Sequence, residues 1–346
     1  MKGNEAISEA AILAGCRHYF GYPITPQNEI PAYMSKRMPQ VGGVFVQAES
    51  EIASISMVLG AASAGMRAMT SSSSPGISLK TEGISYLAGC DLPAVIVNVQ
   101  RGGPGLGSIQ PAQSDYNQAT KAPGHGDLRV LVLAPYSVQE MADLVFEMFD
   151  LTEKYRIPGL ILCDGVLGQM MEPVHLPEVE VKPADKPWAT TGHQNNRKHN
   201  IINSLCLQPD LLEEQNIVRA ARYAKIEQDE TRAENFLTED AEILVVAYGA
   251  SARIAKSAVS AARQQGIKAG LFRPITLWPF PKNELVAASR SSKTLLAVEM
   301  SMGQMVHDVK YAIEFKKPVH FFGRTGGVVP TPGEVLGQLK NMAEGV

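Results

Sequence analysis

Cysteine is scarce in this chain of 346 residues, and its four cysteines lie far apart in the sequence. No two of them form a Cys-x-x-Cys pair, a spacing that recurs in structural zinc sites and in iron–sulfur proteins. Cys16, Cys90 and Cys163 stand among apolar or small residues, where a free cysteine is usually a small buried side chain. We therefore expect the chain by itself to hold neither a metal ion nor an iron–sulfur cluster.

Long apolar runs and an excess of one charge are also missing. No stretch approaches the roughly 18 uninterrupted apolar residues of a membrane-spanning helix, and residues 1–15 contain acidic side chains, unlike a signal peptide. The 32 basic and 35 acidic residues leave a net charge of −3. These features argue against a membrane or nucleic-acid partner and predict a globular, cytoplasmic protein.

Short apolar runs alternate with segments of helical length along most of the chain. The runs are typical of buried parallel strands and lie at 43–50, 66–73, 93–101, 128–135, 158–164, 243–249, 269–274, 293–300 and 318–324. Segments of helical length, such as 51–65 and 137–155, separate them. This order predicts an α/β protein with two doubly wound domains.

The alternation is interrupted after residue 171 by a stretch rich in proline and polar residues. Such a composition is typical of a linker, and a charged helical segment at 213–230 follows it. We therefore expect a first domain at 1–175, a linker and helical connection at 176–239, and a second domain at 240–346.

The segment 19–31 (YFGYPITPQNEIP) places two prolines around Ile24 and Thr25. Proline restricts its own φ and biases the preceding residue to an extended conformation, so Pro23 and Pro26 hold the Thr25 hydroxyl in one direction. Ligand sites in open α/β sheets lie in loops after the carboxyl ends of strands, which makes this loop a candidate. The alternative is a rigid turn in which Pro26 begins a helix.

Two acidic residues, Glu49 and Glu51, stand where the run at 43–50 gives way to a helical segment. We expect at least one of the two carboxylates to face inward at the end of the sheet, where it can serve as a general acid or base. The alternative is that both are acids of a first helical turn, which the helix dipole favours.

Arg101 ends a very apolar run and leads into a loop that contains four glycines within residues 102–107. A guanidinium at this place can offer two parallel hydrogen bonds to a carboxylate, and the glycines let a ligand approach the backbone. The alternative is an internal ion pair, because arginine is rarely buried without a partner.

Three further motifs carry less information. Residues 102–107 (GGPGLG) do not form a GxGxxG motif, and 70–76 (TSSSSPG) lacks the GK[ST] of a phosphate-binding loop. Residues 163–165 (CDG) and 195–196 (NN) faintly resemble the signature that holds magnesium and diphosphate in thiamine diphosphate enzymes. The first glycine of that signature is missing and prolines fill the intervening segment, so we place no metal site there.

Five motifs together resemble the alpha-type subunit of the 2-oxoacid:ferredoxin oxidoreductases, most closely the branched-chain 2-oxoisovalerate (3-methyl-2-oxobutanoate) type. They are GYPITP at 21–26, QAESEIASI at 47–55, TSSSSPGISLK at 70–80, VNVQRGGPGLGS at 97–108 and QPAQSD at 110–115. The resemblance covers nearly the full length. It implies a pyrimidine-binding domain of a thiamine diphosphate enzyme at 1–175, followed by a transketolase C-terminal-like domain at 240–346.

The resemblance also implies roles for individual residues. In the family the Y-P-I-T-P loop lies against the thiamine, which places Pro23 near the aminopyrimidine and the Thr25 hydroxyl on the 2-oxoacid. The family's glutamate aligns with Glu51 rather than Glu49, where it would bond the pyrimidine nitrogen as a general acid and base. The family's arginine aligns with Arg101, which would bind the substrate.

The implied activity is oxidative decarboxylation of a branched-chain 2-oxoacid, with the acyl group passed to coenzyme A and electrons passed through iron–sulfur clusters to ferredoxin. Relatives with a broader substrate range often carry a hydroxyl residue where this chain has Leu106, and an apolar side chain is consistent with a branched substrate. Thiamine diphosphate would be shared with a beta-type subunit that carries magnesium and the clusters, and gamma- and delta-type subunits could complete a hetero-oligomer.

Three alternatives stay open on the sequence. The first is a subunit of a 2-oxoglutarate- or pyruvate-type ferredoxin oxidoreductase. The second is a transketolase- or pyruvate dehydrogenase-type subunit, against which the YPITP motif and the position of Arg101 argue. The third is a non-enzymatic scaffold or binding module that has kept the fold.

Overall fold

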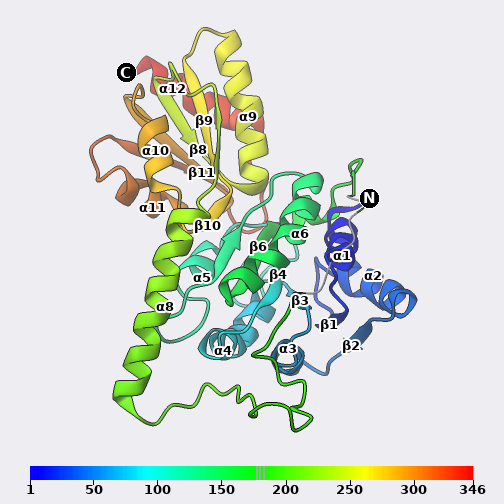
Figure 1. Ribbon diagram of the computed structural model, residues 1–346. Coiled ribbons are helices and arrows are strands. Elements are labelled where there is room, and N and C mark those ends of the chain that lie inside the picture. Colours follow the sequence, from blue (N-terminus) through cyan, green and yellow to red (C-terminus); the bar gives the residue numbers. More distant parts are fainter. Residues whose placement is uncertain (177, 179–180, 182–183, 346) are drawn as a thin grey trace.

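The structure, a computed structural model, contains two α/β units built around separate sheets (Figure 1). It describes residues 1–176, 178, 181 and 184–345. Part of the predicted linker, at 177, 179–180 and 182–183, lies outside the described residues. All nine apolar runs form strands, and the prediction of an α/β protein with two doubly wound domains is confirmed.

The first sheet has seven strands in the order β10-β5-β6-β4-β3-β1-β2. Six of them are parallel, and β10 runs antiparallel to β5. All residues of β3, β4 and β6 are buried, as expected for strands covered on both faces. The strands are β1 (His18–Gly21), β2 (Val44–Gln47), β3 (Ala68–Ser72), β4 (Ala94–Gln100), β5 (Leu131–Leu133), β6 (Pro158–Asp164) and β10 (Thr276–Trp278).

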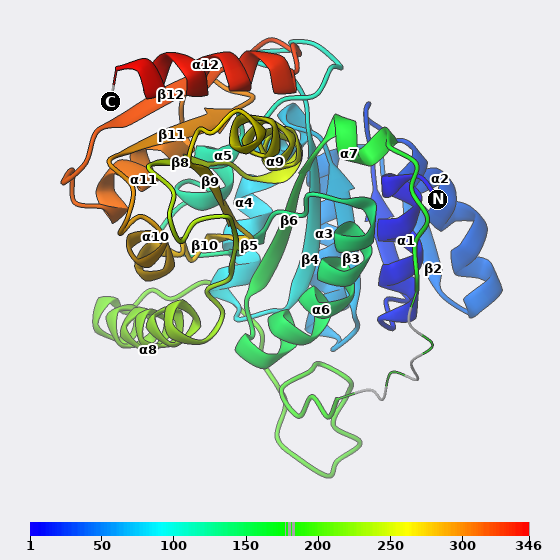
Figure 2. The same ribbon diagram turned by 90° about the horizontal axis from the view of Figure 1, so that it is seen from above.

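Helices cover both faces of this sheet (Figure 2). α1 packs against α6, and α3 packs against α4. α6 begins where the Ser137 hydroxyl accepts a hydrogen bond from the backbone amide of Glu140, a typical N-cap. The helices are α1 (Gly3–Leu13), α2 (Glu29–Arg37), α3 (Glu51–Ser63), α4 (Pro75–Gly89), α5 (Tyr116–Thr120), α6 (Val138–Tyr155) and α7 (Gly165–Gln169), with a 3-10 turn at Met38–Val41.

The second sheet has five strands in the order β12-β11-β8-β9-β7. β7 runs antiparallel to β9, and the other neighbours are parallel. α9 packs against α12, and α10 packs against α11. The elements are β7 (Ala233–Phe236), β8 (Ile243–Val246), α9 (Gly249–Gln264), β9 (Ala269–Pro274), α10 (Lys282–Ala288), β11 (Thr294–Glu299), α11 (Met305–Ala312), β12 (Val319–Gly323) and α12 (Pro332–Glu344).

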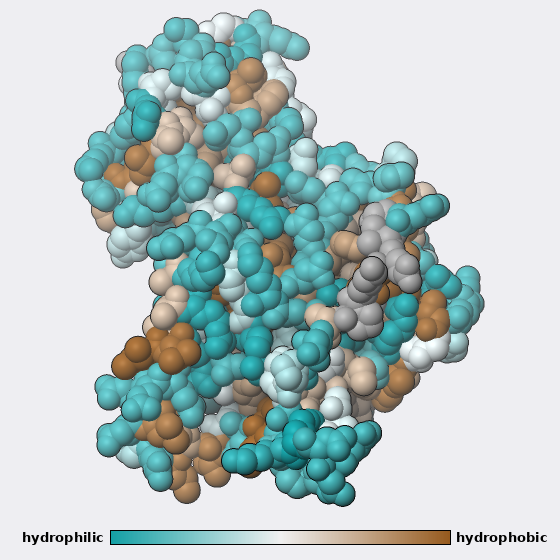
Figure 3. Space-filling view, in the orientation of Figure 1, coloured by the Kyte–Doolittle hydropathy of each residue, from teal (hydrophilic) through white to brown (hydrophobic). Residues whose placement is uncertain are grey.

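The predicted charged helix is α8 (Pro209–Asp229), which lies along the outside of the molecule (Figure 1). Arg219 and Arg222 tie it to the first unit through ion pairs with Asp91 at 3.2 and 2.7 Å. Apolar side chains remain exposed on α8 and on the segment before it (Figure 3), at Ile201, Leu205, Leu207, Leu211, Leu212, Ile217 and Val218. None of the helices that the structure describes is long and apolar enough to cross a membrane.

Two of the four cysteines are buried, and Cys90 and Cys206 are partly exposed. Cys16 and Cys163 are fully enclosed, and Cys90 is partly exposed. Burial raises the pKa of the Cys16 thiol to about 12, so this thiol stays protonated and unreactive at neutral pH. The prediction of small core residues is therefore confirmed for Cys16 and Cys163, and only in part for Cys90.

Gln113 is a buried side chain that joins the two units. Its amide nitrogen donates to the carbonyl of Tyr248 at 2.8 Å. Its amide oxygen accepts from the Ser251 hydroxyl at 2.6 Å and from the backbone amide of Met300 at 3.0 Å. A single glutamine thus satisfies backbone and side-chain groups on two loops of the second unit, which ties those loops to the first.

A second connection is the buried guanidinium of Arg273 on β9, whose side chain is only 3% exposed. It donates to both carboxylate oxygens of Glu140 on α6, at 2.9 and 2.7 Å, and to Glu234 on β7 at 2.9 Å. It also lies over the ring of Tyr136, 4.0 Å from the ring centroid. Bidentate pairing of this kind fixes orientation as well as distance, so it aligns the second sheet on the first unit.

We predict that Arg273→Met destabilises the full chain, because it leaves Glu140 and Glu234 without their shared cation. Removing one partner of a buried pair costs about 3 kcal/mol or more in free energy of unfolding, and the partly exposed glutamates put this case at the lower end. Denaturant titration measures the loss.

The matched control for that experiment is Arg253→Met, at an ion pair with Glu172 whose arginine is 43% exposed. Exposed pairs contribute less than about 1 kcal/mol, so the control should unfold almost like the unsubstituted chain. If the free energy of unfolding falls no more in Arg273→Met than in Arg253→Met, the Arg273 cluster does not stabilise the contact between the units.

Candidate functional site

Four loops meet at one edge of the first sheet because β4, β3, β1 and β2 are neighbouring parallel strands. The loops are 22–28 after β1, 48–50 after β2, 73–74 after β3 and 101–115 after β4. Each residue predicted for the site lies in one of these loops or in the helical turn that follows it. The carboxyl edge of these four strands is therefore the candidate site.

The loop after β1 is anchored through its backbone. The Pro26 carbonyl accepts hydrogen bonds from Asn4 Nδ2 at 2.9 Å and from Gln169 Nε2 at 3.2 Å. The peptide bond between Thr25 and Pro26 is cis. Pro26 precedes α2 rather than beginning it, so the helix-start alternative for this proline is wrong. Pro23 is exposed and Thr25 is half-buried, so both present side-chain atoms at the surface of the loop.

Glu51 is the inward-facing acid of the pair, and Glu49 is exposed. The Ser50 hydroxyl caps α3 by accepting from the Ala53 amide at 3.2 Å, which makes Glu51 the first helical residue and turns its side chain toward the sheet. Glu51 is only 6% exposed. Among the described residues we find no hydrogen-bond donor to its carboxylate oxygens.

The Glu51 carboxylate lies over the N-terminus of α4. A side chain at Gly76, in the first turn of α4, would place its Cβ 2.7 Å from Glu51 Oε1 and 2.0 Å from Ser72 Oγ. Glycine is therefore required where these two polar groups gather. The positive end of the α4 dipole favours a carboxylate there, which offsets part of the cost of its burial. The Ser72 hydroxyl is itself buried and has no hydrogen-bond partner among the described residues.

Arg101 connects two of the four loops. Its terminal nitrogens donate to the carbonyls of Thr25 and Leu106, each at 3.0 Å. It is only 6% exposed, and its buried Nε has no hydrogen-bond partner in the part of the chain that the structure describes. No carboxylate in the described part of the chain forms an ion pair with it, so the internal ion pair considered from the sequence is not found. The structure brings Arg101 and Thr25 into direct contact.

Ser74 and Asp115 support Arg101, and the sequence did not single them out. The Ser74 hydroxyl lies 3.0 Å from the backbone nitrogen of Arg101 and donates to Asp115 at 2.6 Å, and Asn98 Nδ2 also donates to that carboxylate at 2.9 Å. Burial raises the pKa of Asp115, although the bonds from Ser74 and Asn98 oppose the shift. Ser74 has a φ of 23°, a strained value for a residue other than glycine. The signal was the QPAQSD motif, whose last residue is Asp115.

The triplet at 163–165 has a structural role. The Asp164 carboxylate accepts from the backbone amides of Val166 (3.0 Å) and Leu167 (3.2 Å) at the start of α7, and from Ala250 (3.3 Å) at the start of α9. Burial raises the pKa of Asp164 to about 6. The asparagines at 195–196 are exposed. In the described part of the chain, no three His, Cys, Asp or Glu side chains gather in a way that could hold a metal ion.

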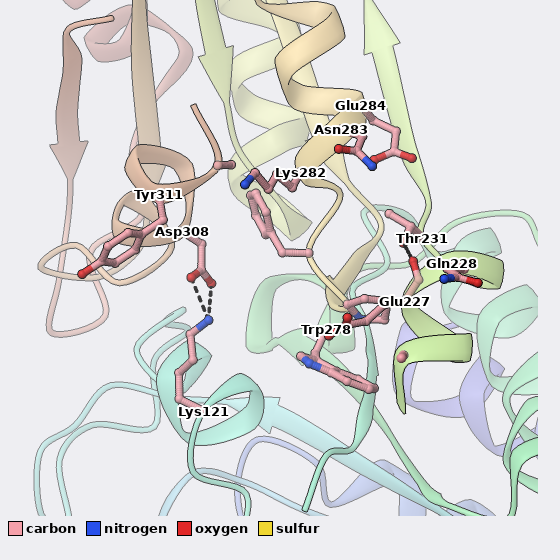
Figure 4. A pocket seen from close by; sticks show the side chains of 14 residues that line it. Lys121, Glu227, Gln228, Thr231, Trp278, Lys282, Asn283, Glu284, Asp308 and Tyr311 are labelled. Atoms are coloured by element: carbon pink, nitrogen blue, oxygen red, sulfur yellow. Dashed lines mark hydrogen bonds and ion pairs between the residues drawn. The ribbon is translucent and has the colours of Figure 1, made fainter. Parts of the chain in front are cut away.

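A separate groove of about 730 Å³ lies between α8, α10 and α11 (Figure 4). Trp278 and Glu227 line one part of it, and Lys121 and Asp308 form an ion pair at 2.7 Å in another part. Its lining contains none of the residues predicted for the site. Its walls are the sides of helices, the end of β10 at Trp278 and the turn that follows, and none of the four candidate loops lines it, so it is distinct from the candidate site.

Two family models together match most of the chain. Residues 9–245 match the thiamine diphosphate-binding domain of pyruvate flavodoxin/ferredoxin oxidoreductases. Residues 241–335 match core domain II of pyruvate:ferredoxin oxidoreductase. The first model includes all four loops of the candidate site, and the second covers most of the second sheet.

The chain is 52% identical, over 99% of its length and 97% of the relative, to the ketoisovalerate oxidoreductase subunit VorB of Methanothermobacter marburgensis. Its fold matches the 2-oxoglutarate:ferredoxin oxidoreductase from Magnetococcus marinus with a TM-score of 0.87 and 27% identity, covering 99% of this chain but only 64% of that longer one. A split-gene transketolase matches in fold alone, with a TM-score of 0.65 and 15% identity over 99% of this chain and 97% of that one. The chain therefore belongs to the 2-oxoacid:ferredoxin oxidoreductase family, as a subunit whose first domain is of the thiamine diphosphate-binding type.

Proposed function

We propose that this chain is one subunit of an enzyme that oxidatively decarboxylates a branched-chain 2-oxoacid, forms the acyl-CoA and passes the electrons to ferredoxin. Residues 1–175 would carry this chain's half of the site, 176–239 would connect the domains, and 240–346 would form the second domain. The 52% identity to a ketoisovalerate oxidoreductase subunit over nearly the full length supports the substrate class.

The observation that carries the proposal is two opposite charges, both buried and neither paired. The Glu51 carboxylate has no hydrogen-bond donor, and the Arg101 guanidinium has no carboxylate, among the described residues. A buried charge without a partner is costly, so each group is best explained by a ligand or a partner chain that completes it. A cofactor with a ring nitrogen suits Glu51, and an anionic substrate suits Arg101.

The residues present fit thiamine diphosphate. Glu51 would bond the ring nitrogen of the aminopyrimidine and exchange a proton with it, and Pro23 would lie against the ring. Gly76 supports this fit, because a side chain there would collide with the Glu51 carboxylate in its present position. When bound, the cofactor supplies the nucleophilic carbon and the electron sink that decarboxylation requires.

Arg101 and Thr25 would hold the substrate. The guanidinium already bonds the Thr25 carbonyl, so a 2-oxoacid carboxylate on Arg101 would lie beside the Thr25 hydroxyl, which accepts from Asn28 Nδ2 at 3.1 Å and is free to donate its own hydrogen. Leu106, whose carbonyl bonds the same guanidinium, is 85% exposed and would add apolar surface for a branched side chain.

We propose that the remaining parts of the enzyme lie on other chains. A beta-type subunit would bind the diphosphate with magnesium and carry iron–sulfur clusters, gamma- and delta-type subunits would complete the assembly, and ferredoxin would accept the electrons. Coenzyme A would enter as co-substrate. The exposed apolar side chains on and before α8 support an assembly, because a lone protein rarely leaves such a group open to water.

A second candidate is a 2-oxoglutarate-type enzyme of the same family, which the fold match to the 2-oxoglutarate:ferredoxin oxidoreductase favours. The complex co-purified with this chain decides between the two. We expect it to reduce a viologen dye or ferredoxin with 3-methyl-2-oxobutanoate and coenzyme A, at a kcat/KM above that for 2-oxoglutarate or pyruvate. A preference for 2-oxoglutarate would reject the branched-chain assignment, and no reduction with any 2-oxoacid would reject the activity.

We predict that Glu51→Gln lowers turnover of the complex by roughly 100-fold or more, because the amide keeps the shape of the side chain but cannot exchange the proton. The matched control is Glu49→Gln, which changes an exposed acid two residues away. Steady-state kinetics with saturating cofactor measure both. If the two variants lose activity equally, the assignment of the catalytic carboxylate to Glu51 is wrong.

We predict that Arg101→Lys lowers kcat/KM for the 2-oxoacid by about 10- to 150-fold, because an ammonium cannot reproduce the parallel hydrogen bonds, each worth about 1.5 to 3 kcal/mol when charged. Thr25→Val, which keeps the backbone carbonyl and removes only the hydroxyl, should give a smaller loss of the same kind. Calorimetric titration should find the thiamine diphosphate affinity nearly unchanged in both. If thiamine diphosphate affinity falls while kcat/KM for the 2-oxoacid is unchanged, this loop binds the cofactor rather than the substrate.

A further inference from the structure

Lys80 is a fully buried lysine on α4, on the same face as Gly76. Its side chain runs between α3 and α4, where the two helices approach closely because Gly83 has no side chain: a Cβ at that position would lie 2.5 Å from Ile55 Cγ2. The amine therefore reaches the first turn of α3, beneath Glu51.

The partners of this amine are all neutral. It donates to the Thr70 hydroxyl on β3 at 2.9 Å, to the Ser54 hydroxyl on α3, and to the backbone carbonyl of Glu51 at 3.5 Å. No ion pair involves Lys80 within the described ranges. The amine is thus a buried positive charge that is solvated by hydroxyls and a carbonyl rather than neutralised by a carboxylate.

Glu51 is the ionisable residue to which this amine is coupled. α3 carries no other charged side chain, β3 and β4 carry none, and Glu82 on α4 is exposed and bonds Tyr86. Burial lowers the pKa of Lys80 to about 7, and attraction to Glu51 opposes that shift. The amine and the Glu51 carboxylate therefore attract each other across the first turn of α3.

We propose that Lys80 is a positioning residue that holds the first turn of α3 and keeps the Glu51 carboxylate ionised in its buried place. The inference rests on the proposed role of Glu51 at the cofactor ring. The lysine is charged below neutral pH and loses its charge at higher pH, so its attraction for the Glu51 carboxylate is present mainly in the acidic range. In that range the ammonium would stabilise the negative charge that Glu51 needs for the proposed proton exchange.

A purely structural role would not require an amine at this position. Methionine has nearly the same length and would fill the space between α3 and α4 without any desolvation of charge. The hydroxyls of Ser54 and Thr70 would then lose a donor but would keep other ways to bond, since a hydroxyl can rotate. The charge itself is therefore the property that the test must isolate.

The first test is the pH profile of kcat/KM of the complex with Lys80→Met. Without the ammonium, the acidic limb should move up by about one pH unit, which lowers kcat/KM about 10-fold on that limb and leaves it nearly unchanged on the plateau. Thr70→Val, which removes one acceptor and keeps the amine, should move the limb in the same direction by less.

The matched control is Ile55→Val, which loosens the same contact between α3 and α4 without touching a charge. It should lower the unfolding temperature and leave the pH profile in place. If Lys80→Met behaves like this control and leaves the pH profile of kcat/KM in place, Lys80 serves packing alone and the proposal fails.

The second test needs no activity and separates this inference from the proposed function. A double-mutant cycle of Lys80→Met and Glu51→Gln is measured by unfolding of the full chain at pH 6.5 to 9.5. The folded pKa of Lys80 lies below the unfolded one, so the unsubstituted chain should lose stability, relative to Lys80→Met, as the pH falls from about 9.5 toward 7.

The sign of the coupling decides the second test. If Lys80 and Glu51 interact, the gain in stability from Lys80→Met should be larger in the Glu51→Gln background, where the ammonium has lost its counter-charge. Additive effects at every pH would overturn the proposal even if the complex proves to be an active oxidoreductase. A complex without activity, combined with a clear coupling, would instead reject the proposed function and keep the charge pair.

Discussion

The parallel order of β4, β3, β1 and β2 is the constraint on which the rest of this structure depends. Parallel neighbours end at the same edge, so the loops that follow them have to share one small region whatever their sequences are. Loops that share a region must also satisfy one another's backbone groups. Arg101 does this by bonding the carbonyl of Thr25, 76 residues away in the chain, and the carbonyl of Leu106 within its own loop.

Two charges at this edge lack a charged or hydrogen-bonding partner of the expected kind within the described part of the chain. Other buried ions in the described part of the chain have clear partners: Arg273 bonds both oxygens of Glu140, and the Asp164 carboxylate accepts from three backbone amides. At the candidate site Glu51 and Arg101 break this rule, although each is only 6% exposed. Departures from charge pairing gather where ligands bind, because the ligand supplies the missing partner.

Much of the fold could be predicted from the sequence, because a parallel strand covered on both faces must be apolar along its whole length. The runs at 93–101 and 158–164 meet that demand and form β4 and β6. β1, β7 and β10 were not predicted, because HYFG and AENF mix polar with apolar residues and prolines at 274 and 279 stand on either side of TLW. β10 comes from the second half of the chain but pairs antiparallel with β5 of the first sheet. A local sequence pattern does not predict such long-range pairing.

The sequence predicted which residues lie at the candidate site better than it predicted the contacts between them. The motif around Glu51 distinguished it from Glu49, and the cap at Ser50 gives the physical reason, since it sets which of the two acids turns inward. The contact between Arg101 and Thr25 stayed out of reach because it joins two loops across the sheet edge.

Lys80 was missed for a different reason: a lysine in a helical segment normally faces water. Only the close approach of α3 and α4 at Gly83 shows that this lysine has no path to solvent.

An uncharged side chain at position 80 would cost less free energy to bury than this amine does. A methyl-ended side chain at position 80 would pack between α3 and α4 without desolvating a charge, and proteins generally lose stability when they keep an ion in such a place. Stability given up beside a catalytic group is a recurrent feature of enzymes, whose sites are less stable than their scaffolds allow. The amine, the N-terminus of α4 and the N-terminus of α3 all favour negative charge on the same carboxylate. Three sources of positive potential directed at one glutamate are more than helix capping requires, and this excess supports the proposal that the Glu51 carboxylate serves a ligand rather than the helix.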